Sequence, residues 1–254
     1  FFWKLMTIFE RLTFKAAKVS IATNESYRRI AIRRGGKRPE DVFVVRSGPD
    51  LSKVKPVPPN DAWRNGRRFL IGYVGVMGRQ EGIDLLLEAM RHIVYDLGLE
   101  EMKQLSASHG LSDHVTFTGR APDQTLFEVL STADVCVNPD VANPFNDRCT
   151  MNKIMEYMAF GKPMVQFEMT EGRVSAGEAS LYAARNDPHD MAEKLLALLD
   201  DPARRAAMGA FGRDRVAREL SWETQIEPLL SAYERVLGRD KSRLFSGSSA
   251  APAC

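Results

Sequence analysis

The sequence contains no long hydrophobic run. Hydrophobic residues make up 44% of its 254 positions, yet no apolar stretch approaches the roughly 20 residues that a membrane-spanning helix needs. No segment has the pattern of a secretory signal peptide. With 27% charged residues, the composition is typical of a soluble globular protein. We therefore expect a cytoplasmic location, with any membrane contact confined to the inner face of the membrane.

The sequence also has little charge imbalance and few cysteines. Its net charge of +2 is too small to predict nucleic-acid binding. Cys136, Cys149 and Cys254 lack the spacing of a metal site, which favours a reduced protein. No Ser-His-Asp, paired-carboxylate or Cys-His pattern emerges, so the sequence assigns no catalytic residue. Because no acidic cluster suits a metal either, we expect neither a cofactor nor a metal.

The strongest signal is a strand–loop–helix–strand unit in the middle of the chain. Apolar runs at residues 133–137 and 164–167 are typical of short buried strands. Between them, Thr150 is a good N-cap, and residues 151–160 are good helix formers. Gly161 then predicts the end of the helix.

The start of this helix is a candidate phosphate site. Backbone amides at a helix N-terminus attract anions, and we assign this role to Thr150, Met151 and Asn152. Glu156 lies nearly two turns into the helix, where its carboxylate could accept hydrogen bonds from ribose hydroxyls. Lys153 lies in the first turn and is a further candidate, the alternative being an ordinary exposed lysine.

This helix carries a resemblance to a known family. The string from Glu156 onwards, EYMAFGKPMV, resembles the nucleotide-binding helix of GT-B-fold retaining glycosyltransferases, in the large family usually numbered 4. That family has a Glu-x7-Glu pattern that ends on the helix, and Glu156 matches its second glutamate. The first falls on Arg148, a departure, although Asp147 is adjacent. The longer string Asn146–Ala159 resembles a bacterial subgroup acting on cell-surface polysaccharides.

The resemblance implies an α/β fold of the GT-B type, with a Rossmann-type parallel sheet, helices on both faces and the tail end of a second Rossmann-like domain. Residues 1–50 would be the remnant of an N-terminal, acceptor-binding domain whose body is missing, and residues 51–66 a linker. Residues 67–237 would form the nucleotide-sugar-binding C-terminal domain. Residues 238–254 are expected to be disordered. Since Phe1 is not a methionine, we expect the chain to start inside a longer protein, or its beginning to be unseen.

A glycine-rich turn follows the apolar strand expected at residues 68–74, and such a turn lets the backbone approach a phosphate. It contains four candidate donor-binding residues: Gly75, Met77, Gly78 and Arg79. Many relatives place an arginine and a lysine here to hold the diphosphate, whereas this chain has Arg79 and Glu81. Only one cation is therefore expected in this turn.

Three loop residues complete the candidate donor site. A strand expected at residues 115–118 leads to Arg120, and the resemblance implies that backbone groups of this loop contact the nucleobase; a surface turn is the alternative. Asn146 and Asp147 could form hydrogen bonds with sugar hydroxyls. A loop Asn-Asp pair is equally typical of a turn, so both interpretations stay open.

One connection breaks the expected order of elements. A helix expected to end at Gly98 is followed at once by another that begins at Leu99. A βαβ unit should place a strand between them, and relatives have one there. Either this strand was deleted or the sequence skips residues at this point, and we favour the skip. It predicts that the two Cα atoms lie much farther apart than the ~3.8 Å of a trans peptide.

Residues 1–18 predict an amphipathic helix with several lysines and arginines. The favoured interpretation is an ordinary helix packed on a Rossmann sheet. The alternative is a basic helix lying on a membrane surface, which would suit a lipid-linked acceptor.

Together these features predict donor binding in a retaining glycosyltransferase. The expected substrate is a nucleotide-sugar, UDP-linked, whose sugar goes to a glycan or lipid-linked acceptor that contacts the missing N-terminal domain. A GT-B sugar-nucleotide epimerase is one alternative. A nucleotide-binding module without catalysis is another, suggested by Arg148. An NAD-dependent dehydrogenase is disfavoured, because no acidic residue follows a second strand.

Overall fold

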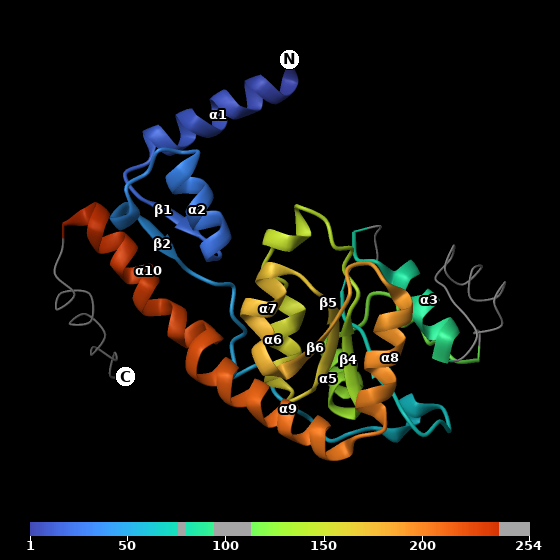
Figure 1. Cartoon of the computed structure of the whole chain (residues 1–254). Coiled ribbons are helices and arrows are strands. Elements are labelled where there is room, and N and C mark those ends of the chain that lie inside the picture. Colours follow the sequence, from blue (N-terminus) through green and yellow to red (C-terminus); the bar gives the residue numbers. More distant parts are fainter. Residues whose placement is uncertain (76–79, 94–112, 239–254) are drawn as a thin grey trace, which may run out of the picture. The chain divides into compact units, whose positions relative to one another are not determined.

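The computed structural model describes residues 1–75, 80–93 and 113–238 (Figure 1). Its internal contacts divide the chain into two compact units, Phe1–Ser47 with Trp222–Cys254, and Gly48–Ser221. The contacts group the last helix with the first unit, whereas the C-terminal domain expected from the sequence ran to residue 237. No helix among the described residues is long and apolar enough to cross a membrane.

The first unit contains a parallel pair of strands, β1 (Ser20–Ala22) and β2 (Val42–Val44). Its helices are α1 (Phe2–Ala16), α2 (Glu25–Arg33) and α10 (Trp222–Leu237), with a 3₁₀ turn at Pro39–Asp41. Asn24 caps α2, because its side chain accepts a hydrogen bond from the Tyr27 amide at 2.9 Å. The small core of this unit contains three buried side chains: Ala22, Ala31 and Val42.

α1 has no buried residue, although Phe14 packs against this small core. Phe2 and Trp3 are 73% and 76% exposed. The expectation of an ordinary helix packed on a sheet is therefore wrong for the part of the chain that the structure describes. Among the described residues, the two short strands mainly contact α2 and α10 instead.

The second unit is built on a four-stranded parallel sheet in the order β3-β4-β5-β6. The strands are β3 (Ile71–Gly72), β4 (Val135–Asn138), β5 (Met164–Phe167) and β6 (Ser180–Ala183). All residues of β4 and β5 are buried, as in parallel sheets covered on both faces. Cys136 of β4 belongs to one core cluster, whereas Val135 and Val137 belong to another. The sheet therefore separates two apolar layers.

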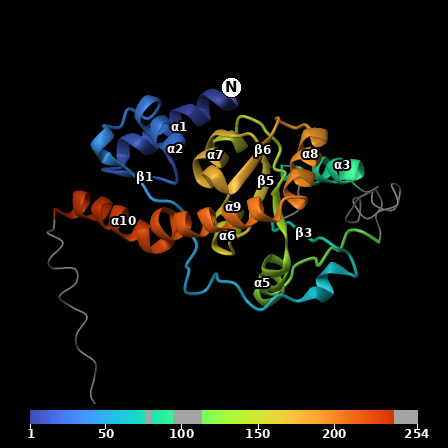
Figure 2. The same ribbon diagram turned by 60° about the horizontal axis from the view of Figure 1, so that its bottom comes forward.

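Helices cover both faces of this sheet, which confirms the expected α/β architecture (Figures 1 and 2). One core cluster involves α5 (Asp123–Thr132) and α6 (Asn152–Ala159); the other involves α3 (Ile83–Ile93) and α8 (Pro188–Leu199), which lie side by side. The remaining helices are α7 (Thr170–Ala176) and α9 (Pro202–Arg215), which continues as a π-helical turn, Val216–Leu220. Short 3₁₀ turns lie at Asp61–Arg64, Asn146–Arg148 and Gly177–Ala179.

Two expected strands differ from the structure. β3 contains only two residues of the stretch 68–74, and residues 115–118 form no strand. A strand needs a hydrogen-bonded partner, and among the described residues only β4 pairs with β3. The suspected skip between Gly98 and Leu99 lies outside the described residues, as does the tail after residue 238.

Residues 168–178 contain α7, a helix that none of the sequence signals described above predicted. The Asp147 carboxylate accepts hydrogen bonds from the backbone amide and the hydroxyl of Thr170, each at 3.0 Å. These bonds satisfy a donor at the start of α7. Because the two residues are 23 positions apart, the local sequence gave no sign of this cap.

Candidate functional site

A cavity of about 1080 Å³ lies beside β3 and reaches the exits of β3 and β4. Ligands of open parallel sheets usually bind at such carboxyl ends of strands. The predicted donor-binding residues that line the cavity are Gly75, Arg120, Asn146, Thr150, Met151, Asn152, Lys153 and Glu156. Asp147 does not line it. Met77, Gly78 and Arg79 lie outside the described residues.

The first turn of α6 forms one wall of the cavity. The helix begins at Asn152 with Met151 as its N-cap, one residue later than expected, so Thr150 is not the cap. Met151 has extended backbone and no capping side-chain hydrogen bond. The amides of Asn152 and Lys153 have no intrahelical acceptor in an α-helix, and both residues line the cavity. This wall therefore offers backbone donors to an anion.

Lys153 turns into the cavity wall rather than into solvent. Its Nζ lies 2.8 Å from Oδ1 of Asp140, and the two side chains are only 12% and 3% exposed. The same ammonium lies 5.0 Å from the centre of the Tyr73 ring. The alternative of an ordinary exposed lysine is therefore excluded, and a buried cation stands beside the helix amides.

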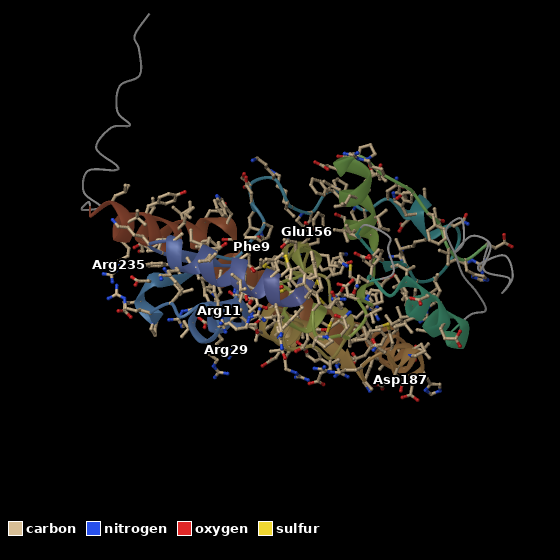
Figure 3. The ribbon with its side chains drawn as sticks, turned by 90° about the horizontal axis from the view of Figure 1, so that it is seen from above. Phe9, Arg11, Arg29, Glu156, Asp187 and Arg235 are labelled. Atoms are coloured by element: carbon tan, nitrogen blue, oxygen red, sulfur yellow. The ribbon has the colours of Figure 1, made fainter. Side chains whose placement is uncertain are left out.

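Glu156, labelled in Figure 3, lies one turn further along α6. It is half-buried and lines the same cavity. Burial raises its pKa, and the nearby Lys153 ammonium opposes this shift. Burial also raises the pKa of Asp140, again opposed by Lys153. Carboxylates with raised pKa values at a cavity wall are typical of functional sites, because burial costs free energy that a ligand can recover.

Tyr157 ties α6 to the sheet below the cavity, a role that the sequence analysis missed. Its side chain is fully buried, and its hydroxyl accepts a hydrogen bond from the Val74 amide at 2.9 Å. The hydroxyl donates to the Val137 carbonyl at 3.1 Å. The exits of β3 and β4 are thereby fixed relative to the helix. The presence of a tyrosine on an otherwise apolar helix face was the sequence signal that could have predicted this role.

Asn146 and Asp147 hold loops together. Asn146 is 4% exposed, and its side-chain amide donates to the carbonyls of Gln80 and Val141 at 3.0 and 2.9 Å. Burial raises the pKa of Asp147, but the hydrogen bonds from Thr170 and the ion pair with Arg185 outweigh this and hold it below its ordinary value. The structure thus favours the turn interpretation for Asp147, whereas Asn146 also lines the cavity.

The cavity lining also contains apolar side chains, among them Leu70, Ile71, Leu86, Leu126 and Val129. The exposed Arg120 lines the cavity as well, as do Arg64, Arg67 and Arg68. Among the described residues, no group of three or more His, Cys, Asp or Glu side chains is arranged to hold a metal ion. The cavity lining therefore combines polar groups of α6 with apolar side chains from β3, α3 and α5.

A family profile described as "Glycosyl transferases group 1" matches residues 68–201, just over half of the chain. The chain is 26% identical to a 2-deoxystreptamine glucosyltransferase of Streptomyces kanamyceticus, over 93% of this chain and 65% of that protein. It is 29% identical to a D-inositol 3-phosphate glycosyltransferase of Thermomonospora curvata, over 88% and 58%. The chain thus spans between about half and two thirds of the length of these relatives.

Solved structures are similar to this chain in fold, although their sequence identity to it is low. A sucrose-phosphate synthase from Thermosynechococcus elongatus superposes with a TM-score of 0.78 at 23% identity, covering 92% of this chain and 62% of that one. The Anabaena protein HepE in complex with UDP gives a TM-score of 0.75 at 17% identity, covering 88% and 65%. At these identities the similarity shows the fold.

Proposed function

The chain belongs to the family of group 1 glycosyl transferases, and on this basis we propose that it forms the donor-binding part of a retaining glycosyltransferase. The fold is of the GT-B type. The proposed donor is a UDP-sugar, and the proposed acceptor is a glycan or a lipid-linked sugar. One observation carries this proposal: the first-turn amides of α6, the Lys153 ammonium and the Glu156 carboxylate all line one cavity at the strand exits.

The polar groups of α6 in the cavity lining suit the binding of a nucleoside diphosphate and its ribose. The amides of Asn152 and Lys153 and the Lys153 ammonium would bind the diphosphate, which is the leaving group of the reaction. Glu156 would accept hydrogen bonds from ribose hydroxyls. When the anomeric bond breaks, its electron pair passes to the diphosphate oxygen, and these donors stabilise the charge that develops there.

The apolar part of the cavity lining suits a nucleobase. Its leucine and isoleucine side chains offer a face for the flat ring, and the loop at Arg120 offers backbone groups for its polar edge. UDP as the nucleotide is supported by the neighbours solved with it, the Anabaena protein HepE and Staphylococcus aureus TarM. A relative from Corynebacterium glutamicum is named as GDP-mannose-dependent, so GDP is the base to test against UDP.

The acceptor and the place of action are proposed from the resemblance of residues 146–159 to enzymes of bacterial surface polysaccharides. A surface glycan would be extended on the cytoplasmic side of the membrane. Acceptor contacts are expected on an N-terminal domain, as are the residues that complete catalysis. We therefore propose that this chain binds the donor more effectively than it transfers sugar.

A nucleotide-binding module without catalysis is the second candidate. Arg148 stands where the family has its first glutamate, and it is exposed outside the cavity lining. The full-length protein separates the two functions. Release of UDP from a UDP-sugar only when an acceptor is present supports transfer, whereas UDP binding without any turnover supports the module.

Thermal unfolding with UDP, GDP, ADP and NAD tests the proposed function. A ligand at about 100 times its Kd stabilises the folded state by roughly 2.7 kcal/mol, which raises Tm by several degrees. We expect the largest shift with UDP. A larger shift with GDP would change the proposed base, and a larger shift with NAD would overturn the functional class.

A further inference from the structure

The ion pair between Asp140 and Lys153 has no explanation in the fold alone. Its two charged atoms lie 2.8 Å apart and are almost entirely buried. A buried ion pair adds little stability, because desolvation of the charges offsets their attraction. Asp140 also lines the donor cavity, and its second oxygen, Oδ2, is buried without a hydrogen-bond partner among the described residues. Such a costly arrangement at a cavity wall points to a ligand.

The loop that carries Asp140 is held in place by its neighbours. The Val141 amide donates a hydrogen bond to the Gln80 carbonyl at 2.9 Å. Gly82 has a φ of +58°, and a Cβ atom there would lie only 2.0 Å from the Pro139 carbonyl oxygen. The turn at residues 80–82 can therefore lie directly against the Asp140 loop. Asp140 consequently presents its carboxylate to Lys153 from a fixed backbone.

Lys153 retains a donor for a ligand. An ammonium group has three N–H donors. Asp140 accepts one of them, and the Tyr73 hydroxyl, 3.5 Å away, accepts a second weakly. Among the described residues these are the hydrogen-bond partners of the Lys153 ammonium. One N–H is thus left for a ligand in the cavity, next to Gly75 at the exit of β3.

The donor cavity needs this cation. Glu81 and Asp140 both line the cavity, and the negative charge of Glu81 contributes to the raised pKa of Asp140. A diphosphate would therefore meet carboxylates from the glycine-rich turn and from the β4 exit. Lys153 offers the compensating positive charge from α6, in direct contact with Asp140.

We propose that Asp140 is the positioning residue of the donor site, which holds the Lys153 ammonium against Tyr73 so that it binds the diphosphate. This inference rests on the proposed function, since it concerns the same nucleotide. Asp140 acts through Lys153 and touches no phosphate itself. Removing its negative charge should therefore weaken the binding of an anion, the opposite of what simple charge repulsion predicts.

A double-mutant cycle with Asp140→Asn and Lys153→Met tests the proposal, with UDP and uridine as the two probes in calorimetry. A hydrogen bond to a charged group corresponds to roughly 10–100-fold in affinity. We expect each single variant to weaken UDP binding at least tenfold and to leave uridine binding within about twofold. The double variant should bind UDP as Lys153→Met does, because the two side chains act as one unit.

The possible results separate this inference from the proposed function. Unchanged or tighter UDP binding by Asp140→Asn overturns the positioning role, as does an additive loss in the double variant. Unchanged uridine binding shows that each variant is folded; loss of uridine binding together with UDP would mean that Asp140 merely supports the fold, which also contradicts the proposal. A wild-type chain that binds UDP no better than uridine overturns the diphosphate site itself.

Discussion

α6 in the second unit and α1 in the first are both amphipathic helices, but they differ in how much of their apolar surface is buried. In α6, Tyr157 and Met158 are fully buried between the sheet and other helices. In α1, Phe2 and Phe9 are 73% and 54% exposed. The spacing of apolar residues thus predicts which side of a helix is apolar, but not what covers it. A functional site needs the packed kind of helix, because its donors must stay in place.

The largest effect that separates the two helices is expected from a core truncation. Met158→Ala should lower the free energy of unfolding by about 2–5 kcal/mol, because it removes a fully buried side chain and leaves a cavity. Met6→Ala, at a site 51% exposed on α1, is the matched control and should change it by less than about 0.5 kcal/mol. Urea unfolding measures both. Equal losses would break the comparison.

Glu156→Gln should affect binding and stability in opposite directions. Loss of the carboxylate is expected to weaken UDP binding by roughly 10–100-fold. Because burial raises the pKa of Glu156, its ionised form disfavours the folded state at neutral pH, and this penalty disappears as the pH falls below the ordinary pKa of a glutamate. The variant should therefore be more stable than the wild type at pH 7, with the difference vanishing near about pH 4.

Calorimetry with UDP and thermal unfolding across this pH range check the two parts. A variant that is less stable at neutral pH, with UDP binding intact, would show that Glu156 serves the fold and not the ligand. Glu178→Gln is a suitable control, since this glutamate lies outside the cavity lining.

A smaller loss of stability is expected when the hydrogen bonds between α6 and the strand exits are removed. Tyr157→Phe removes the hydroxyl that accepts from the Val74 amide and donates to the Val137 carbonyl. A buried donor left without an acceptor costs about 1–3 kcal/mol. Tyr233→Phe, at a side chain 55% exposed on α10, should cost almost nothing. If both variants unfold at the same urea concentration, the hydroxyl does not tie the helix to the sheet.

The smallest effect is expected on α1. Phe9→Ala should change the free energy of unfolding by less than about 0.5 kcal/mol, because most of this side chain is already in solvent. The measurement is urea unfolding followed by circular dichroism. A loss above 2 kcal/mol, the range of a buried aromatic side chain, would show that α1 is packed in solution.

The sequence predicted the elements that follow local rules. β4, α6 and β5 came from a buried apolar run, a helix-forming stretch and a stop at Gly161, and all three are found within one or two residues. The strand at 115–118 and the full length of β3 failed, since a strand depends on a partner that periodicity cannot supply. The helix α7 was not predicted, because the Asp147 carboxylate that caps it is remote in the sequence.

The candidate site divides in the same way. Lys153 and Glu156 were predicted from their places on the helix and its resemblance to a known family, and both line the cavity. Asp140, Tyr73 and Tyr157 were missed, because their roles come from contacts between elements that are far apart in the chain. Residues at the start of a helix can thus be predicted from the sequence as ligand-binding candidates. Residues that position them from other elements become visible only in the folded structure.

Backbone NMR during a UDP titration tests the central claim most directly. The amide resonances of Asn152 and Lys153 should shift strongly with UDP and little with uridine, because only UDP places a phosphate at the start of α6. If UDP shifts resonances elsewhere while these two amides stay unchanged, the nucleotide does not bind at this helix and the account is wrong.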